Sequence, residues 1–571
     1  MRLVGFLIWL AALIVLFGVR WWAGLAFFAL TLPLLAWAVR RHRAIGRAAA
    51  RARTLAELAG GELAALNHEF GAFADGAEFL HVLHRYALDL DVFGPGSLFQ
   101  FINRTVTAPG RVRLAAALLG DHDEEQRART QVQSKLLSKD PDWCLSFRAI
   151  GDGLADDVSY FDRLLDWVEV GDVAPVDRER WLLYAAPLLS VAGVAWMLLA
   201  SPWQLGVLFF LPAVWMLRRY RTVVEEAHER TAAMGELLRT YAELLDFATT
   251  RPGGVTHVGD PAAALRRLAY LTGQLDVRYN PFAIFLEVGG LWSLNRLRQL
   301  DAWRARYRRE LPAWLDLLAE TDALVSWATL RFNRPGWADP AFNDEQIVEA
   351  RNLGHPLLHP AGRVTNDFAM RTDGHIHLVT GSNMAGKSTW LRTVGLNIVL
   401  ANAGGPVCAI SEDGLTPALL NLPPDLEVWT SMRTQDDLTA ATSSFYAELK
   451  RLSHIVRAVS DPDRRVFFLL DEILKGTNSR DRHTGSRALI RQLIRDRGAG
   501  IIATHDLELA ALQNEPGSRV ENFAMEVQTR GEQLYFDYKL RPGVCESFNA
   551  TALMARMGIE IPPKEIRLRH D

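Results

Sequence analysis

The chain has 571 residues and a net charge of −3, so it can hold several domains and lacks the overall basic charge of many nucleic-acid-binding proteins. Hydrophobic residues make up 49% of it, which is high for a wholly soluble enzyme. Three widely spaced cysteines, Cys144, Cys408 and Cys545, exclude a readable disulfide framework or zinc spacing and suit a reducing compartment.

Residues 1–43 predict a transmembrane helical hairpin. Uncharged runs at 3–19 and 21–39 are long enough, or nearly so, to cross a hydrocarbon core of about 30 Å. A cluster of arginines follows the second run and Arg2 precedes the first, which predicts that both ends are cytoplasmic. A signal peptide over residues 1–25 is the competing interpretation, and the second apolar run with the arginines after it argues against cleavage.

Residues 181–217 predict a second transmembrane hairpin. The run 182–199 is uncharged, Ser201 and Pro202 make a turn, and 205–217 is apolar but short for a span. Arginines flank both ends, which favours the same in–out–in arrangement. A buried core hairpin or a re-entrant segment is the alternative. The two hairpins predict a multi-pass protein of the cell membrane whose other parts are cytoplasmic.

The stretches 44–180 and 218–345 predict mostly helices, because apolar residues recur at spacings of three and four. In the second stretch, six arginines between residues 296 and 309 are interleaved with Trp303 and Tyr307. This run could face nucleic acid or anionic lipid headgroups. A solvated helix face whose arginines pair with nearby acids is the interpretation that we favour.

From residue 346 to 571, short β-like runs alternate with helical ones, as in an α/β nucleotide-binding domain. The predicted strands are 376–380, 466–470, 500–504 and 534–539. The first strand is followed by GSNMAGKS, which fits the phosphate-loop pattern G-x-x-x-x-G-K-[ST], and then by a helix-like run. Strand, loop and helix in this order are the context that the motif requires.

In such a loop, backbone N–H groups would surround a triphosphate, Lys387 would reach the β- and γ-phosphates, and the Ser388 hydroxyl would ligate Mg²⁺. The positive end of the following helix would point at the anion. The predicted nucleotide-binding residues are Gly381, Ser382, Asn383, Met384, Ala385, Gly386, Lys387, Ser388 and Thr389.

Two acids and a histidine end the next two predicted strands. Asp471 would hold Mg²⁺ directly or through water, and Glu472 would polarise the attacking water as general base. His505 could orient or sense the γ-phosphate. The alternatives are exposed acids at the end of a buried strand and a structural histidine. Ser443 and Ser444 precede a helix, where small hydroxyls suit N-capping or contacts to a phosphate from a neighbouring subunit.

Together these motifs resemble the MutS family of DNA mismatch-repair ATPases, which are relatives of the ABC-type ATPases. TGSNMAGKST is similar to the family's TGPNMGGKST, DDLTAATSSFYAEL to DDLxxGxSTFxxEM, LLDEILKGTNSRD to LLDEIGRGTSTxD, and ATHDLEL to ATHYxEL. Upstream, Gly96–Leu114 and Leu311–Pro335 resemble the two ends of the family's helical core.

The resemblance implies an α/β P-loop ATPase domain of ABC-like fold, preceded by an all-α core and lever region and two transmembrane hairpins. It implies ATP and Mg²⁺ as cofactors and a homodimer with composite sites, which ATP would switch. The residues it assigns are Glu472, His505 and Lys387 for catalysis, Ser388 and Asp471 for the metal, and Ser443 and Ser444 for contacts in trans.

The chain also departs from the family. A membrane hairpin stands where the mismatch-recognition domain with its wedge would lie, and the second hairpin interrupts the core near the lever helices and DNA clamp. Arg363 stands in the segment where the family has the aromatic that stacks on adenine. Ala441 replaces a signature glycine.

Three functions fit this pattern. The first is a membrane-anchored MutS-like ATPase that switches a dimer and engages DNA, in mismatch repair or another DNA process. The second is an ATP-driven membrane mechanoenzyme that acts on a protein or lipid partner without DNA. A transporter-like ATPase ranks last, because four short spans without intramembrane charges make a poor translocation path.

Overall fold

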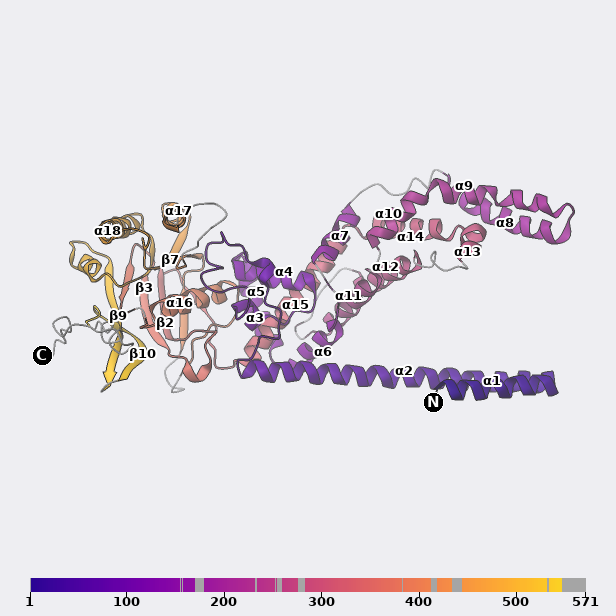
Figure 1. Cartoon of the computed structure of the whole chain (residues 1–571), viewed down its shortest axis with the longest axis horizontal. Helices are drawn as coiled ribbons and strands as arrows, with labels where there is room; N and C mark the ends of the chain where they lie inside the picture. Colours follow the sequence, from indigo (N-terminus) through magenta and orange to yellow (C-terminus); the bar gives the residue numbers. More distant parts are fainter. Residues whose placement is uncertain are drawn as a thin grey trace, which may run out of the picture. The chain divides into compact units, whose positions relative to one another are not determined.

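The computed structural model describes residues 2–154, 156, 158–169, 179–231, 234–251, 253, 259–275, 283–382, 384–411, 418–433, 444–530 and 533–546. The chain divides into two compact units, 1–63 and 64–571. The second unit holds an all-α region followed by a mixed α/β domain (Figure 1).

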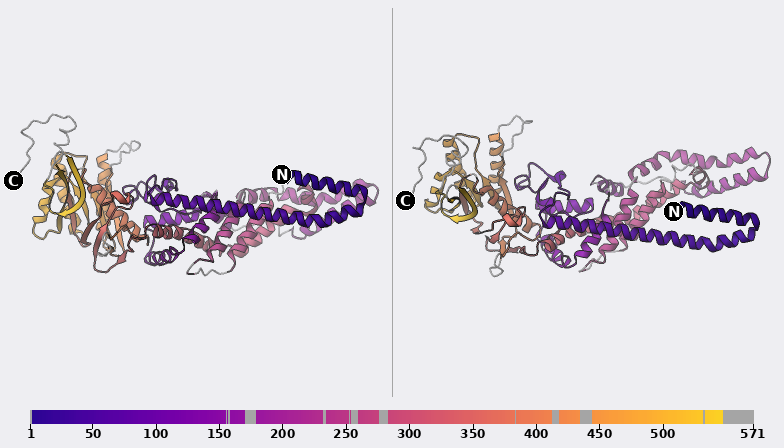
Figure 2. Two further views of the ribbon diagram at one scale, coloured as in Figure 1. Left: turned by 90° about the horizontal axis from the view of Figure 1, so that it is seen from below. Right: turned by 60° about the horizontal axis from the view of Figure 1, so that its bottom comes forward.

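The first unit is a helical hairpin. Helices α1 (Arg2–Val19) and α2 (Trp21–Leu66) lie side by side, as Figures 1 and 2 show. The Trp9 indole N–H donates to the Thr31 hydroxyl at 2.8 Å and joins them. The α2 helix is long and apolar enough to cross a membrane by length and composition, and the apolar part of α1 is shorter. The first predicted hairpin is therefore present as two helices, although α2 does not end near residue 43.

The all-α region of the second unit is organised around α15, whose middle turns are buried. Trp303 is also buried, and the Arg304 guanidinium donates to the Trp167 carbonyl at 3.3 Å inside this core. Trp303 is thus a packing residue of this core, which argues against the option that it faces nucleic acid or lipid headgroups. The helices are α3 (Leu98–Ile102), α4 (Ala108–Leu119), α5 (Glu124–Leu137), α6 (Pro141–Gly151), α7 (Val158–Glu169), α10 (Arg221–Thr231), α11 (Met234–Ala248), α12 (Pro261–Leu275), α14 (Trp292–Tyr307) and α15 (Leu311–Asn333).

A buried carboxylate holds α4 against α15. Asp322 of α15 accepts hydrogen bonds from the backbone N–H groups of Val106 and Thr107 and from the Thr107 hydroxyl, the last at 2.6 Å. The absence of a side chain at Gly110 lets α4 come this close to Asp322, since a Cβ at residue 110 would lie 2.1 Å from the Asp322 carboxylate. Burial raises the pKa of Asp322 to about 6.

The second predicted hairpin consists of α8 (Leu182–Leu199), a 3-10 helix η3 (Trp203–Phe210) and α9 (Leu211–Arg219). The returning arm is therefore two short helices rather than one apolar run, and Pro212 stands in the first turn of α9, where its missing N–H costs no hydrogen bond. The α8 helix is also long and apolar enough to cross a membrane. Within the stretch 218–345, which predicted mostly helices, α13 (Ala283–Gly290) contacts α8 and α9.

The α/β domain contains a six-stranded sheet in the order β10-β9-β4-β8-β7-β6, with β10 antiparallel to β9 and the other neighbours parallel. A four-stranded sheet, β1-β5-β2-β3, lies in the same domain. The four predicted strands are confirmed as β4, β7, β8 and β10. The strands are β1 (Ala341–Phe342), β2 (Ile347–Leu353), β3 (Asn366–Arg371), β4 (Ile376–Thr380), β5 (Leu419–Leu422), β6 (Leu426–Ser431), β7 (Arg465–Asp471), β8 (Ala499–Thr504), β9 (Val520–Arg530) and β10 (Gln533–Pro542).

Three helices accompany the large sheet: α16 (Lys387–Asn402), α17 (Ser444–Val459) and α18 (Ser479–Arg495). Because β4, β8 and β7 are parallel neighbours, the residues that follow them meet at one edge of the sheet. In the strand register Thr380 pairs with Thr504, and Asp471 with Ala503. This register brings together the loop after β4, the acids at the end of β7 and the histidine after β8.

Candidate functional site

The glycine loop between β4 and α16 begins and ends at glycines that the backbone requires. Gly381 has φ 156° and lies under the Met525 carbonyl, which would be 2.5 Å from a Cβ. Gly386 has φ 97°, in the left-handed region, and caps α16. The loop thus bends back sharply, so that α16 starts with its N-terminus facing the sheet edge. Asn383 lies outside the described residues.

Lys387 is buried at the start of α16, and its ammonium group lies within the loop. Its Nζ donates to the carbonyls of Gly381 and Ser382 at 2.8 and 2.9 Å. Burial lowers the pKa of Lys387, while Glu472 and Asp471 act in the opposite direction. The carbonyl contacts hold the ammonium group at the centre of the loop, where a phosphate group would be bound.

Ser388 and Asp471 form a pair at the same place. The Ser388 hydroxyl donates to an Asp471 carboxylate oxygen at 2.5 Å, although the two residues are 83 positions apart in the chain. A hydroxyl and a carboxylate are hard oxygen ligands of the kind that Mg²⁺ prefers, and it binds through one or two carboxylates together with substrate phosphates. The donor set therefore fits a magnesium site beside the loop.

Glu472 and His505 approach each other from the ends of neighbouring strands. The His505 Nδ1 lies 3.5 Å from one Glu472 oxygen, and the Lys475 Nζ lies 3.8 Å from the other. Glu472 has φ 52°, uncommon for a residue with a side chain, and its N–H donates to the Ala503 carbonyl at 2.9 Å. The strained backbone at Glu472 turns the chain at the sheet edge, beside the loop.

Helix α17 reaches the turn that follows Glu472. The Glu448 carboxylate accepts hydrogen bonds from the backbone N–H groups of Leu474 and Lys475, at 2.5 and 3.2 Å. Burial raises the pKa of Glu448. Ser443 lies outside the described residues, and the side chain of Ser444, the first residue of α17, is not described either. Their expected role in trans therefore stays a prediction.

A cavity of about 280 Å³ opens beside the glycine loop. Its lining includes Tyr538 of β10, whose ring would be 2.8 Å from a Cβ on Gly386, and Thr389 and Trp390 of α16. His355 also lines it, and burial lowers the pKa of His355 to about 4, so that its ring is neutral at pH 7. The cavity has the place and the aromatic wall that a nucleoside attached to the loop's phosphates needs.

Arg363 stands in the sequence where the family resemblance leads us to expect an aromatic residue, and its side chain contacts neighbouring residues. Its guanidinium donates to the Leu358 carbonyl at 2.7 Å and lies over the Trp337 ring. Tyr538 lines the cavity together with Trp390, and it stands in a bulge of β10 with φ 53°. No local pattern marks Tyr538 as a site residue, because it lies far from the loop in the chain and only the pairing of β10 with β9 brings it back.

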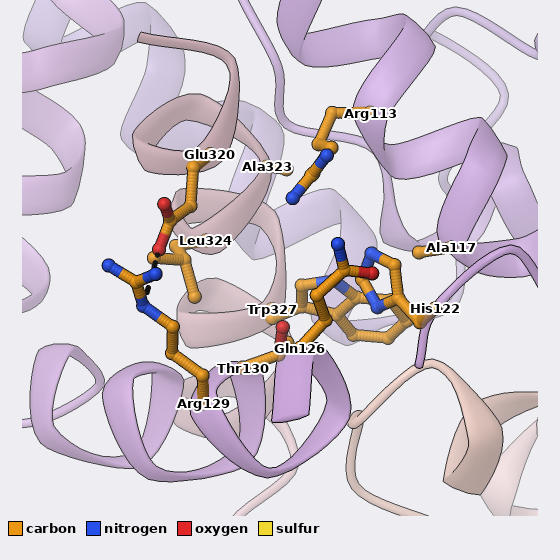
Figure 3. Close-up of a pocket in the computed structure, with 10 residues that line it drawn as sticks. All are labelled: Arg113, Ala117, His122, Gln126, Arg129, Thr130, Glu320, Ala323, Leu324 and Trp327. Carbon is orange, nitrogen blue, oxygen red and sulfur yellow. Dashed lines mark ion pairs between the residues drawn. The ribbon is translucent and has the colours of Figure 1, made fainter. Parts of the chain in front are cut away.

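A second cavity lies in the all-α region between α4, α5 and α15, and Figure 3 shows its lining. Arg129 pairs there with Glu320 at 3.2 Å, and burial lowers the pKa of His122 to about 4. Trp327 also lines it, and the chain after α16 packs on this ring, since a Cβ on Gly405 would be 2.4 Å away. The helix that starts at the glycine loop thus ends against the all-α region.

These contacts define a mixed α/β domain in which basic, acidic and hydroxyl side chains meet at a strand, glycine loop and helix junction. Residues 377–567 match the family model described as MutS domain V. The match covers the loop, the acids at the end of β7 and the histidine after β8.

Relatives of this kind are similar over 40–47% of the chain. The DNA mismatch repair protein MutS of Carboxydothermus hydrogenoformans is 31% identical over 42% of this chain and 28% of its own length. The DNA mismatch repair protein MutS of Aquifex pyrophilus is 31% identical over 40% of this chain and 25% of its own length. The DNA mismatch repair protein MSH3 of Phaeosphaeria nodorum is 30% identical over 47% of this chain and 23% of its own length. The chain spans about a quarter of the length of these curated relatives. The chain is therefore similar to MutS domain V over residues 377–567, and to these relatives at 30–31% identity.

Proposed function

We propose that this chain is a membrane-anchored MutS-like ATPase, in which ATP binding and Mg²⁺-dependent hydrolysis switch a homodimer. One observation carries the proposal: the Ser388–Asp471 pair and the Glu472–His505 pair meet at the loop that holds Lys387. Similarity to MutS domain V supports it from the sequence. The class of reaction is transfer of a phosphoryl group to water.

Each residue of the site has a role in this proposal. Lys387 exchanges its loop carbonyls for the β- and γ-phosphates, and Ser388 and Asp471 hold the metal. Mg²⁺ supplies neutralising charge to the phosphates when it is bound. Glu472 orients the attacking water and accepts its proton, and His505, which is 3.5 Å from that carboxylate, steadies it beside the γ-phosphate.

The activity is tested with full-length protein in detergent. Glu472→Gln should lower the ATPase rate by about a hundredfold or more while the variant still binds ATP, because it removes the base and leaves the phosphate contacts in place. Glu508→Gln is the matched control: this acid is on the same sheet edge, and its side chain is 81% exposed. Turnover of Glu472→Gln at the parental rate would refute the assignment of the base.

DNA is the proposed partner because the relatives are named as DNA mismatch repair proteins. The measurement is ATP-dependent binding of duplex DNA across a salt series, since phosphate contacts weaken steeply as salt rises. Absence of binding even at low salt would remove DNA from the proposal. That result would leave the second candidate, an ATP-driven mechanoenzyme that acts on a protein or lipid partner.

The second candidate has an observation of its own. The loop helix α16 is followed by Gly404 and Gly405, and these pack on α5 and on Trp327 of α15 so closely that a Cβ would come within 2.6 and 2.4 Å. Rigid packing of this kind transmits small shifts, because close-packed interfaces do not deform continuously. Movement at the loop would thus reach the helices of the all-α region whether or not DNA is bound.

Membrane anchoring rests on the apolar helices α2 and α8, whose length and composition allow a span. Both hairpins would cross and return, so that the α/β domain is cytoplasmic. A reporter that is active in the cytoplasm, fused after Arg43, should be active, and the same reporter fused within the predicted turn after Ala200 should be silent. The homodimer is tested by crosslinking of the Glu472→Gln variant with ATP, which should raise the dimer fraction.

A further inference from the structure

Helix α13 presents an apolar surface to the outside that the all-α core does not cover. Ile284 is 62% exposed, Phe285 74% and Leu286 43%. Three bulky apolar side chains in succession on one short helix are costly in water, at about 25 cal/mol per Å² of exposed apolar area. The expected partner of such a surface is apolar.

The one charged residue of α13, Glu287, is half-buried and hydrogen-bonded. The Glu287 carboxylate accepts the Ser293 backbone N–H at 3.2 Å and also binds the Ser293 hydroxyl. Ser293 is in the first turn of α14, so the carboxylate also compensates the positive end of that helix. The exposed side of α13 therefore carries no charge among its described residues.

The backbone of α13 is also satisfied where the helix ends. The Ser190 hydroxyl of α8 donates to the Val288 carbonyl at 2.9 Å. The Asn295 amide donates to the carbonyls of Gly290 and Leu291 at 2.9 and 3.2 Å. Carbonyl groups at a helix end that face water need no such partners, whereas a helix that ends inside hydrocarbon requires them.

The contact with Ser190 places α13 along the length of α8. Ser190 is close to the middle of α8 (Leu182–Leu199), about 12 Å from its start and about 13.5 Å from its end at 1.5 Å per residue. If α8 spans a hydrocarbon core of about 30 Å, a helix bonded at its midpoint lies within that core. The α8 helix, which contacts α13, also exposes apolar residues such as Leu188 and Val191.

The basic residues nearby lie towards the start of α8. The Arg298 guanidinium of α14 donates to the Tyr184 hydroxyl at 3.0 Å, in the first turn of α8. Arg218 and Arg219 end α9, the returning arm. Arginines at this level suit the headgroup region, where their charge stays hydrated or meets anionic lipid.

We propose that α13 is a re-entrant membrane element: it lies in the hydrocarbon beside α8, contacts lipid acyl chains through Ile284, Phe285 and Leu286, and returns to the cytoplasmic side through α14. This inference rests on the proposed span of α8. The occupant of the surface is lipid, and a surface covered by a second copy of the chain or by water would appear as missing acyl-chain quenching at Phe285→Cys.

The test uses the full-length protein in vesicles of phosphatidylcholine and phosphatidylglycerol. Phe285→Cys is labelled with a polarity-sensitive fluorophore, and quenching is measured with a nitroxide on the lipid acyl chain or on the headgroup. The native cysteines Cys144, Cys408 and Cys545 are buried, so the label reacts at the introduced thiol. Val191→Cys in α8 reports the span itself, and Val132→Cys, exposed on α5, reports water.

We expect Phe285→Cys to be quenched by the acyl-chain nitroxide as strongly as Val191→Cys, and Val132→Cys to be unquenched. Quenching at Val191→Cys without quenching at Phe285→Cys would overturn the re-entrant element and leave the span of α8 standing. Loss of quenching at both positions would refute the span and the inference with it. Leu286→Cys gives a second reading on α13, which guards against a local effect of one substitution.

Discussion

The carboxylate of Glu448 accepts a hydrogen bond of 2.5 Å from the backbone N–H of Leu474, in the turn that follows Glu472. Leu474 has φ 60° and Glu472 φ 52°, so this turn stores backbone strain that neighbouring contacts must offset. Gly476, in the same turn, packs against Phe445 of α17, since a Cβ there would lie 2.6 Å from the Phe445 Cβ. The helix that begins at Ser444 thus supports the turn that positions Glu472.

From this contact we predict that Glu448 is a positioning residue. Glu448→Gln removes one acceptor and leaves a half-buried N–H unpaired, at a cost of about 1–3 kcal/mol. The turn should then hold Glu472 less well, and kcat for ATP should fall about tenfold or more while KM changes little. Lys450→Gln, an exposed change on the same helix, should have no effect. A rise in KM as large as the fall in kcat would indicate a damaged nucleotide site instead.

Lys387→Met separates binding from stability. The pKa of Lys387 is lowered by burial, which means that the charged ammonium group costs folding free energy where it lies. We expect the variant to lose binding of a non-hydrolysable ATP analogue by about a hundredfold, because its contact with the phosphates is charge-assisted. The nucleotide-free variant should unfold at a temperature equal to or above that of the parent protein. A clear drop in Tm would show that the carbonyl contacts stabilise more than burial costs.

Tyr538 tests the cavity beside the loop. Tyr538→Ala should weaken binding of an ATP analogue by up to about tenfold, because stacking on an aromatic ring contributes about 0.5–1.5 kcal/mol. Tyr538→Phe keeps the ring and should bind as the parent does. Inorganic triphosphate, which has no base, should bind all three proteins equally. A loss of triphosphate binding in Tyr538→Ala would mean that the ring supports the loop at Gly386 rather than a base.

The raised pKa of Asp322 leads us to predict that the stability of the folded protein falls as the pH rises. Its pKa is raised by burial to about 6, above the value of about 3.9 for an unfolded chain, so folding favours its protonated form. Its contribution to stability is fully present below about pH 4 and is lost as the pH rises through about 6, by up to about 3 kcal/mol. Asp322→Asn, which cannot titrate, should show a smaller fall in Tm between pH 4 and 7 than the parent.

The matched control for this measurement is Asp316→Asn on the same helix. Asp316 has a side chain that is 63% exposed and lies 3.6 Å from Arg113. Its Tm should follow the parent's dependence on pH. Asp322→Asn should also be less stable throughout, since it leaves the Thr107 N–H or hydroxyl unpaired. An unchanged pH profile would show that Asp322 does not titrate in this range.

The sequence by itself predicted the strands that carry the candidate site and the loop, acids and histidine that stand at their ends. Glycines, lysine and hydroxyl follow one another within the loop, and the acids and His505 each come directly after a continuous apolar run, so local pattern identifies them. The apolar runs 21–39 and 182–199 were equally readable, because hydrophobic length is a local property.

Only the tertiary structure decided which distant residues complete these elements. Tyr538 reaches the loop through a bulge between β9 and β10, Glu448 reaches the turn after Glu472 from α17, and Asp322 meets Thr107 across 215 positions of the chain. Helix α13 is too short to be recognised from hydropathy. Its position beside α8 is seen only in the hydrogen bond from the Ser190 hydroxyl to the Val288 carbonyl. Contacts between segments far apart in the chain depend on strand register and helix packing, which no local pattern contains.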